Sequence, residues 1–62
     1  MTEYIETYGN ADGVQIEIYF DFINCVYHAD FYTSLGFYKR SITDSDYNKL
    51  IAFLKKKGFR CI

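Results

Sequence analysis

The chain contains no proline and no tryptophan, and it has only two cysteines, Cys25 and Cys61. Two cysteines do not make the disulfide-rich framework of a small secreted domain, so we expect both thiols to be reduced. A bridge between them is compatible with the sequence but has no support in it. The N-terminus also lacks a basic region followed by an apolar run, which predicts a cytoplasmic protein without a signal peptide.

Long apolar segments are missing as well. The most apolar stretch, residues 14–22, is interrupted by Gln15, Glu17 and Asp21, and it is too short to cross a membrane. A chain of 62 residues has room for one domain, residues 1–62, with a small core. Because it carries seven Tyr and six Phe, we expect some aromatic side chains to be exposed, or buried only against a partner.

Positive charge is absent from the first 38 residues. This part of the chain has six acidic residues and no Lys or Arg, whereas residues 39–62 have seven Lys and Arg and two Asp. The two parts therefore carry net charges of −6 and +5, which add to the −1 of the whole chain. Since a surface that serves only solubility usually mixes the two signs, this separation indicates a binding function.

The acidic part of the chain has the pattern of antiparallel strands. Residues 2–8 form the first predicted strand, and the turn-forming segment 9–13, which ends in Asp-Gly, predicts a hairpin. Residues 14–22 alternate strictly between apolar and polar side chains, which indicates a half-buried strand. One face of this strand consists of Val14, Ile16, Ile18, Phe20 and Phe22, and the other of Gln15, Glu17, Tyr19 and Asp21.

The alternation changes phase at Ile23-Asn24. A shift of one residue sends every side chain to the other face, so a turn or a bulge must lie here. We expect a turn with Asn24 in the left-handed conformation, although one long bent strand across residues 14–32 is the alternative. The apolar positions that follow are Ile23, Cys25, Tyr27, Ala29 and Phe31, which places Cys25 on the core face.

Residues 34–36 indicate the next turn, and residues 37–41 the last strand. An amphipathic helix follows, with its N-cap predicted at Thr43 and its end at Gly58. Its apolar stripe consists of Tyr47, Leu50, Ile51 and Leu54, at the spacing of one helix face. The tail, residues 60–62, either lies along the sheet or hangs free.

The predicted fold is therefore α+β: an antiparallel β-sheet of three to four strands with one C-terminal amphipathic helix packed on one face (ββββα). This arrangement leaves the other face of the sheet uncovered. The candidate partner-binding residues on that face are Glu17, Tyr19, Asp21, His28, Asp30 and Tyr32.

No pattern of catalytic, metal-binding or cofactor-binding residues is present, so we expect a protein that is not an enzyme and holds no metal or cofactor. A metal site needs three or four ligands, and His28 is the only histidine. Neither Cys25 nor Cys61 has a base beside it that would activate a thiol, and both read as small hydrophobic residues. His28 itself reads as an exposed strand residue.

We predict a small protein-interaction module. Its acidic, Tyr-bearing face would dock onto a basic groove of a larger protein, where carboxylates take the place of nucleic-acid phosphates. Small, acidic, cysteine-poor proteins are common among phage-encoded inhibitors of host defence or repair proteins. The similarity is one of size and charge alone.

The same sequence supports other interpretations. A nucleic-acid-binding protein would stack bases on sheet aromatics and hold phosphates with Lys39, Arg40, Lys55, Lys56, Lys57 and Arg60. A homo-oligomer, such as a homodimer, would pair the segments of opposite charge between copies and bury the surplus aromatic side chains. Without any partner, the face is an ordinary solvent-exposed sheet surface, on which Tyr and charged residues are common.

Overall fold

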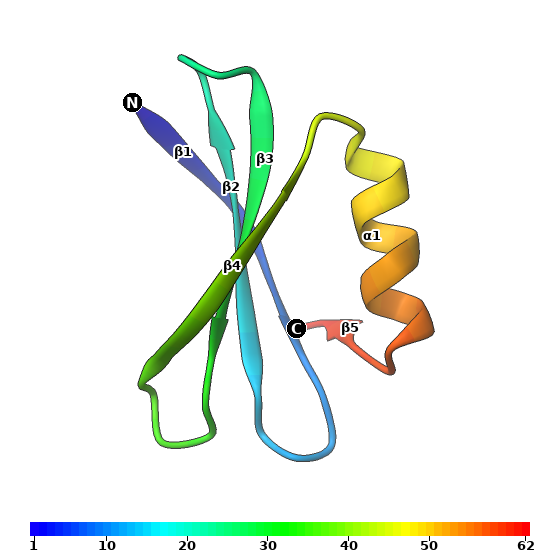
Figure 1. Ribbon diagram of the computed structural model, residues 1–62. Coiled ribbons are helices and arrows are strands. Elements are labelled where there is room, and N and C mark those ends of the chain that lie inside the picture. Colours follow the sequence, from blue (N-terminus) through cyan, green and yellow to red (C-terminus); the bar gives the residue numbers. More distant parts are fainter.

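The chain forms one antiparallel sheet with a single helix on one side of it. The computed structural model describes all 62 residues (Figure 1). The elements are β1 (Thr2–Gly9), β2 (Gln15–Asp21), β3 (Val26–Tyr32), β4 (Tyr38–Asp44), α1 (Tyr47–Lys56) and β5 (Arg60–Cys61). The strands lie in the order β4-β3-β2-β1-β5. The α+β class is confirmed, but the sheet has five strands rather than three to four, and the chain order is ββββαβ. No helix is long and apolar enough to span a membrane.

The end of α1 turns the chain back towards the sheet. Gly58 has a φ of 92°, a left-handed conformation that glycine adopts without steric cost. Its backbone N–H donates to the carbonyl of Lys55, and the N–H of Phe59 donates to the carbonyl of Leu54. These are the two hydrogen bonds of a Schellman motif, so the predicted helix end at Gly58 is confirmed.

The strand β5 is the element missing from the predicted fold. After the reversal at the helix end, its two residues pair antiparallel with Tyr8 and Gly9 of β1. The backbone N–H of Ile62 continues the contact by donating to the carbonyl of Thr7 at 2.9 Å. A strand of two residues is too short to show an alternating pattern in the sequence. Its place in the sheet is set instead by the helix end and by the free edge of β1.

The helix begins later than predicted. Thr43, the expected N-cap, lies within β4 and pairs with His28 of β3. The N-cap is Asp46, whose side chain accepts a hydrogen bond from the backbone N–H of Lys49 at 3.2 Å. Continued pairing of β4 with β3 satisfies the backbone groups around Thr43, and Asp46 is as good a cap as threonine for a helix that starts beyond the sheet.

Residues 14–32 form a hairpin and not one bent strand. Residues 22–25 make the turn between β2 and β3. The residue in the left-handed conformation is Cys25, with a φ of 53°, and not Asn24 as expected. Cys25 is therefore exposed in the turn rather than on the core face, and it forms no disulfide bond with Cys61, which is exposed in β5.

The core lies between α1 and the sheet face that it covers. It consists of Tyr8, Ile16, Ile18, Ala29, Phe31, Leu50, Ile51, Leu54 and Phe59. The predicted apolar stripe of the helix is confirmed at Leu50, Ile51 and Leu54. The predicted apolar face of β2 is confirmed at Ile16 and Ile18, whereas Phe22 is 50% exposed because it lies in the turn beyond the strand.

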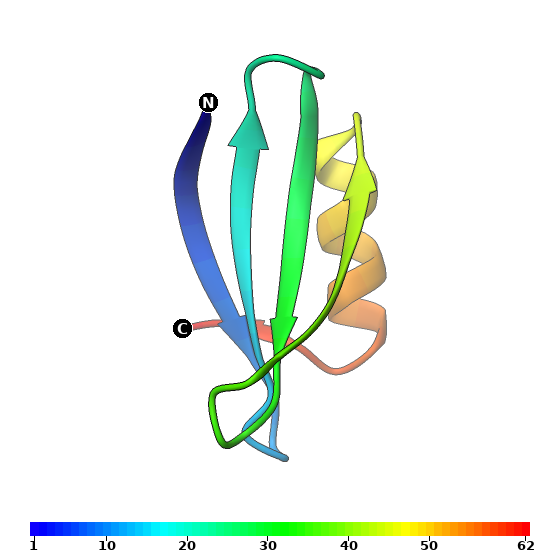
Figure 2. The same ribbon diagram turned by 60° about the vertical axis from the view of Figure 1, so that its left-hand side comes forward.

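The opposite side of the sheet, which we call the outer face, is not covered by any element. Figure 2 shows α1 behind the sheet, so that β2 and β3 are seen from this side as the central strands. Side chains alternate between the two faces of a strand. The register of β2 with β3 therefore places Gln15, Glu17, Tyr19, Asp21, Val26, His28, Asp30 and Tyr32 on the outer face.

Candidate protein-interaction face

The predicted partner-binding residues all lie on the outer face, in two neighbouring strands. They are Glu17, Tyr19 and Asp21 of β2 and His28, Asp30 and Tyr32 of β3. The register sets Glu17 opposite Asp30 and Tyr19 opposite His28. Directly opposed side chains have Cβ atoms about 5 Å apart, so the sheet brings the central four of these residues into one patch.

The centre of the patch is acidic. Glu17 accepts a hydrogen bond from the Tyr19 hydroxyl at 2.9 Å. This bond to a carboxylate raises the pKa of Tyr19 to about 12, because the hydroxyl must give up the bond to ionise. No Lys or Arg side chain pairs with a carboxylate in this chain, and the one contact of this kind is between His28 and Asp21. The charges of Glu17 and Asp30 therefore face each other without a basic partner.

Asp21 has a structural role that the sequence pattern does not reveal. Its Oδ1 accepts hydrogen bonds from the backbone N–H groups of Ile23 and Asn24 at 2.9 and 3.1 Å. Its Oδ2 contacts Asn24 Nδ2 at 2.8 Å and His28 Nε2 at 3.1 Å. These bonds, led by the one from the Asn24 side chain, hold the pKa of Asp21 far below its usual value. Asp21 is buried, so it closes the turn instead of facing a partner.

His28 is held in the same network. Its side chain is 29% exposed, and its Nε2 lies 3.1 Å from the Asp21 carboxylate. His28 is therefore not the simple exposed strand residue that the sequence predicts, because its side chain is partly buried and contacts Asp21. The ring is half-buried and is fixed at the Asp21 end of the patch, next to the turn of residues 22–25.

Two further tyrosines extend the patch across β1 and β4. Tyr4 lies opposite Tyr19, with ring centroids 5.7 Å apart in an edge-to-face arrangement. Tyr38 lies opposite Tyr32 in the same way, at 5.9 Å. Tyr4 is 53% exposed and Tyr38 is 61% exposed. Neither was among the predicted site residues, because only the pairing register of the outer strands places them here.

Apart from Arg60, the Lys and Arg side chains lie on other surfaces. Most belong to α1 or follow it directly: Lys49, Lys55, Lys56 and Lys57. Lys39 and Arg40 of β4 line a hollow on the helix side, together with Leu54. Arg60 of β5 pairs with Gly9, which in turn pairs with Gln15, so Arg60 lies on the outer side of the sheet but on its edge strand, beyond β1. The outer face of β1 to β4 therefore carries no Lys or Arg side chain that balances Glu17 and Asp30.

The outer face is open and not a pocket for an enclosed ligand. One shallow hollow is lined by Thr2, Tyr19, His28 and Asp30. A second lies between the hairpins that join β1 to β2 and β3 to β4, and Glu17 and Tyr32 contribute to it. No group of three or more His, Cys, Asp or Glu side chains is arranged to hold a metal ion.

No protein-family model matches the chain, and neither a curated protein nor a solved structure is significantly similar to it. The charge and geometry of the outer face are therefore the basis on which a function is proposed.

Proposed function

We propose that the protein is a small protein-interaction module that docks its outer face onto a basic groove of a larger protein. The observation that carries this proposal is the unpaired acidic centre, where Glu17 and Asp30 oppose each other on adjacent strands. Like charges directly opposite each other destabilise a sheet. A partner that inserts Lys or Arg side chains between the two carboxylates converts this repulsion into attraction.

The tyrosines around the acidic centre supply contact area. Tyr19 is held at its hydroxyl by Glu17 and at its ring by Tyr4. Tyr32 is held at its ring by Tyr38. Because these rings are already ordered, little side-chain entropy is lost when a partner covers them. Tyrosine is also among the residues that contribute most to binding energy at protein interfaces.

The pattern of acidic groups suggests the class of the partner. Carboxylates held on two adjacent strands present negative charge where a nucleic-acid-binding groove binds phosphates. We propose accordingly that the groove belongs to a nucleic-acid-processing or defence protein. The 62-residue chain would block that groove in the manner of a phage-encoded inhibitor. Complementary charge would speed the encounter and make binding weaker at high salt.

Direct binding of nucleic acid to the outer face is the less favoured function. Bases stacked on Tyr19 and Tyr32 would bring phosphates close to Glu17 and Asp30, which repel them. Lys39 and Arg40 cannot offset this repulsion, because they line a hollow on the helix side of the sheet.

The proposal is tested by affinity capture from a bacterial lysate at low and high salt. Wild-type protein is compared with Glu17→Lys and with the matched control Glu3→Lys, since Glu3 is exposed and lies opposite Phe20, away from the outer face. We expect one stoichiometric basic protein to be captured by the wild type and by Glu3→Lys, to be lost with Glu17→Lys, and to be released at high salt.

Two results would count against the proposal. Capture of the same proteins by wild type and Glu17→Lys would place binding elsewhere on the molecule. A solution mass of a dimer or larger assembly, with no captured partner, would favour a homo-oligomer that pairs the acidic outer face of one copy with the basic side of another. Circular dichroism of each variant shows whether the sheet and helix are intact.

A further inference from the structure

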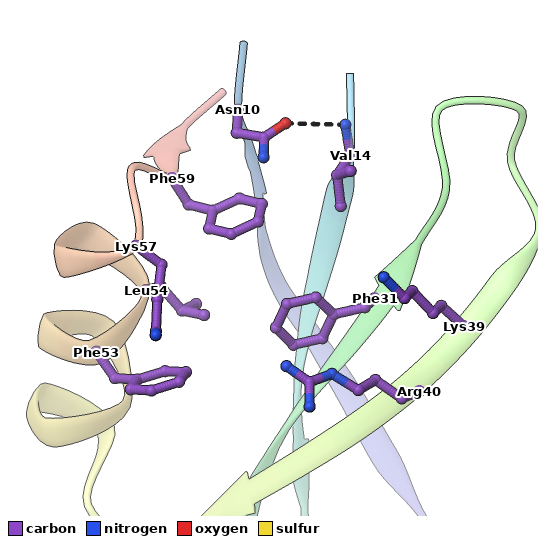
Figure 3. Close-up of a pocket in the computed structure, with 9 residues that line it drawn as sticks. All are labelled: Asn10, Val14, Phe31, Lys39, Arg40, Phe53, Leu54, Lys57 and Phe59. Carbon is purple, nitrogen blue, oxygen red and sulfur yellow. Dashed lines mark hydrogen bonds between the residues drawn. The ribbon is translucent and has the colours of Figure 1, made fainter. Parts of the chain in front are cut away.

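A second surface feature lies on the opposite side of the sheet from the outer face. It is a hollow of about 320 Å³ between the sheet and the C-terminal half of α1, which is at the small end of the range for ligand pockets. Figure 3 shows the hollow with its lining side chains. Its chemistry comes from three cations and three phenylalanines: Lys39, Arg40, Lys57, Phe31, Phe53 and Phe59.

The cations of the hollow have no counter-ion. No carboxylate lines it, and the only ion pair of the chain is His28 with Asp21. The guanidinium of Arg40 lies 5.0 Å from the centroid of the Phe31 ring, and Lys57 Nζ lies 5.5 Å from that of Phe53. Figure 3 shows these two cations on opposite sides of the hollow. An anion bound between them would relieve the repulsion of like charges.

The aromatic rings come from three separate parts of the chain. Phe31 of β3 and Phe59, which precedes β5, are both buried and meet edge to face at 5.9 Å. Phe53 of α1 is 40% exposed, and Figure 3 shows its ring on the helix side of the hollow, next to Lys57. A small inorganic anion would be bound by the cations alone and would make no use of the aromatic rings. The rings favour a ligand that also has a planar, apolar part.

A hydrogen-bond donor completes the lining. Asn10 Oδ1 accepts from the backbone N–H groups of Asp12 and Val14, each at 3.0 Å. This fixes the side-chain amide, and its NH₂ group makes no hydrogen bond within the chain. The amide of Asn10 therefore offers two N–H donors at the edge of the hollow, beside the aromatic rings.

We propose that this hollow binds a nucleotide, either free or as one unit of a single-stranded nucleic acid. Arg40 and Lys57 hold the phosphate, because a guanidinium binds phosphate oxygens in a bidentate fashion. The base stacks on the exposed ring of Phe53, where it replaces the Lys57 ammonium group, which turns to the phosphate. Stacking of this kind tolerates any base. The Asn10 amide, beside Phe59 at the other end of the hollow, offers its donors to a further polar group of the ligand. This site is independent of the proposed docking of the outer face, since the two surfaces share no residue.

The experiment is a titration of the isotope-labelled full chain, followed by nuclear magnetic resonance. The probes are a nucleoside 5′-monophosphate, the same nucleoside without phosphate, inorganic phosphate, and a short single-stranded oligonucleotide. We expect saturable shifts for Arg40, Phe53 and Lys57 with the monophosphate, and binding at least about tenfold weaker with the nucleoside or with phosphate. If the oligonucleotide binds more tightly than the monophosphate, the ligand is one unit of a single strand. If it binds equally or more weakly, the ligand is a free nucleotide.

Substitutions separate this site from a general attraction of anions to a basic surface. Arg40→Gln and Phe53→Leu should each weaken nucleotide binding by about tenfold. The control Lys55→Gln removes one exposed charge of α1 outside the hollow and should leave the affinity within about twofold. The proposal is overturned by a lack of saturable shifts, by equal binding of nucleotide and inorganic phosphate, or by equal losses in Arg40→Gln and Lys55→Gln. The spectrum of each unliganded variant reports whether it is folded.

Discussion

Glu17 of β2 and Asp30 of β3 stand directly opposite each other at the centre of the sheet, and neither carboxylate is paired with a Lys or Arg side chain. The helix side of the same molecule carries Lys39 and Arg40 without a carboxylate partner. These acidic and basic side chains thus form no ion pair with each other. A surface ion pair between them would give the isolated chain only a small gain in stability.

The first prediction concerns the stability of this opposed pair. Asp30→Asn removes one charge from the pair and keeps the shape of the side chain. We expect the free energy of unfolding to rise by a few tenths to about 1 kcal/mol at low salt, because a like-charge contact is lost. Urea denaturation at low and high salt measures the change, and the gain should shrink at high salt because ions screen the repulsion.

The control for this prediction is Asp12→Asn. Asp12 is exposed in the hairpin between β1 and β2, and its side chain accepts no hydrogen bond. The control changes the net charge equally but leaves the pair intact, so its stability should change little. A loss of stability in Asp30→Asn, or a gain of equal size in both variants, would show that the two carboxylates do not repel each other measurably.

The second prediction concerns the turn that Asp21 closes. The pKa of Asp21 is lower in the folded chain than in the unfolded chain, because hydrogen bonds from Asn24 and the other turn groups favour its ionised form. Its stabilising effect is therefore complete above the ordinary carboxyl pKa of about 3.9 and is lost as the pH falls below that value. Asp21→Asn should lower the unfolding temperature at neutral pH. As the pH is lowered, the unfolding temperature of this variant should fall less than that of the wild type.

Thermal unfolding followed by circular dichroism from neutral pH to strong acid measures this effect. Glu3→Gln serves as the matched control, because Glu3 is exposed near the chain start, and it should follow the wild-type curve. If Asp21→Asn loses stability in acid as steeply as the wild type, the hydrogen bonds of Asp21 are not the source of the pH dependence.

The third prediction concerns the hydroxyl of Tyr19. Its pKa is raised to about 12, first by the hydrogen bond to Glu17, from an ordinary value of about 10. The stabilisation linked to this shift is fully present below pH 10 and is lost as the pH rises through about 12. Glu17→Gln should bring the pKa of Tyr19 down towards 10, measured from the ring resonances of Tyr19 as a function of pH. An unchanged pKa in Glu17→Gln would refute the role of this bond.

The fourth prediction concerns the core. Leu54 of α1 is fully buried, and Leu54→Ala leaves a cavity that costs roughly 2–5 kcal/mol. Since a domain of this size has only a small margin of stability, much of the variant should be unfolded at room temperature. Lys55→Ala, on the exposed side of the same helix, should stay within about 0.5 kcal/mol of the wild type. Similar urea midpoints for both variants would place Leu54 outside the core.

The parts of the fold that the sequence predicts are those with a local repeat. Ile16 and Ile18 alternate with polar residues in β2, and Leu50 and Leu54 repeat at helical spacing; each pattern specifies its own buried face. The N-cap at Asp46 and the pairing of β5 do not follow from such repeats. Both depend on where β4 stops pairing with β3 and where β1 leaves a free edge, which are tertiary relationships.

The candidate site divides in the same way. Alternation alone assigns Glu17 and Tyr19 to the face away from the helix, and the register confirms this. It does not reveal that Asp21 is used inside the turn, because a hydrogen-bonded carboxylate and a free one look alike in sequence. It also misses Tyr4 and Tyr38, whose neighbours across the sheet are fixed only when the strands pair.

The most direct test of the central claim is the affinity of the captured partner for the outer face, measured by titration calorimetry. Three proteins are compared: the wild type, Asp30→Lys, and Glu3→Lys, which carries the same change of charge on the other side of the sheet. If the partner binds the acidic outer face, Asp30→Lys weakens binding by about tenfold or more. The affinity of Glu3→Lys then stays close to that of the wild type. Equal affinity of Asp30→Lys and the wild type would contradict this claim.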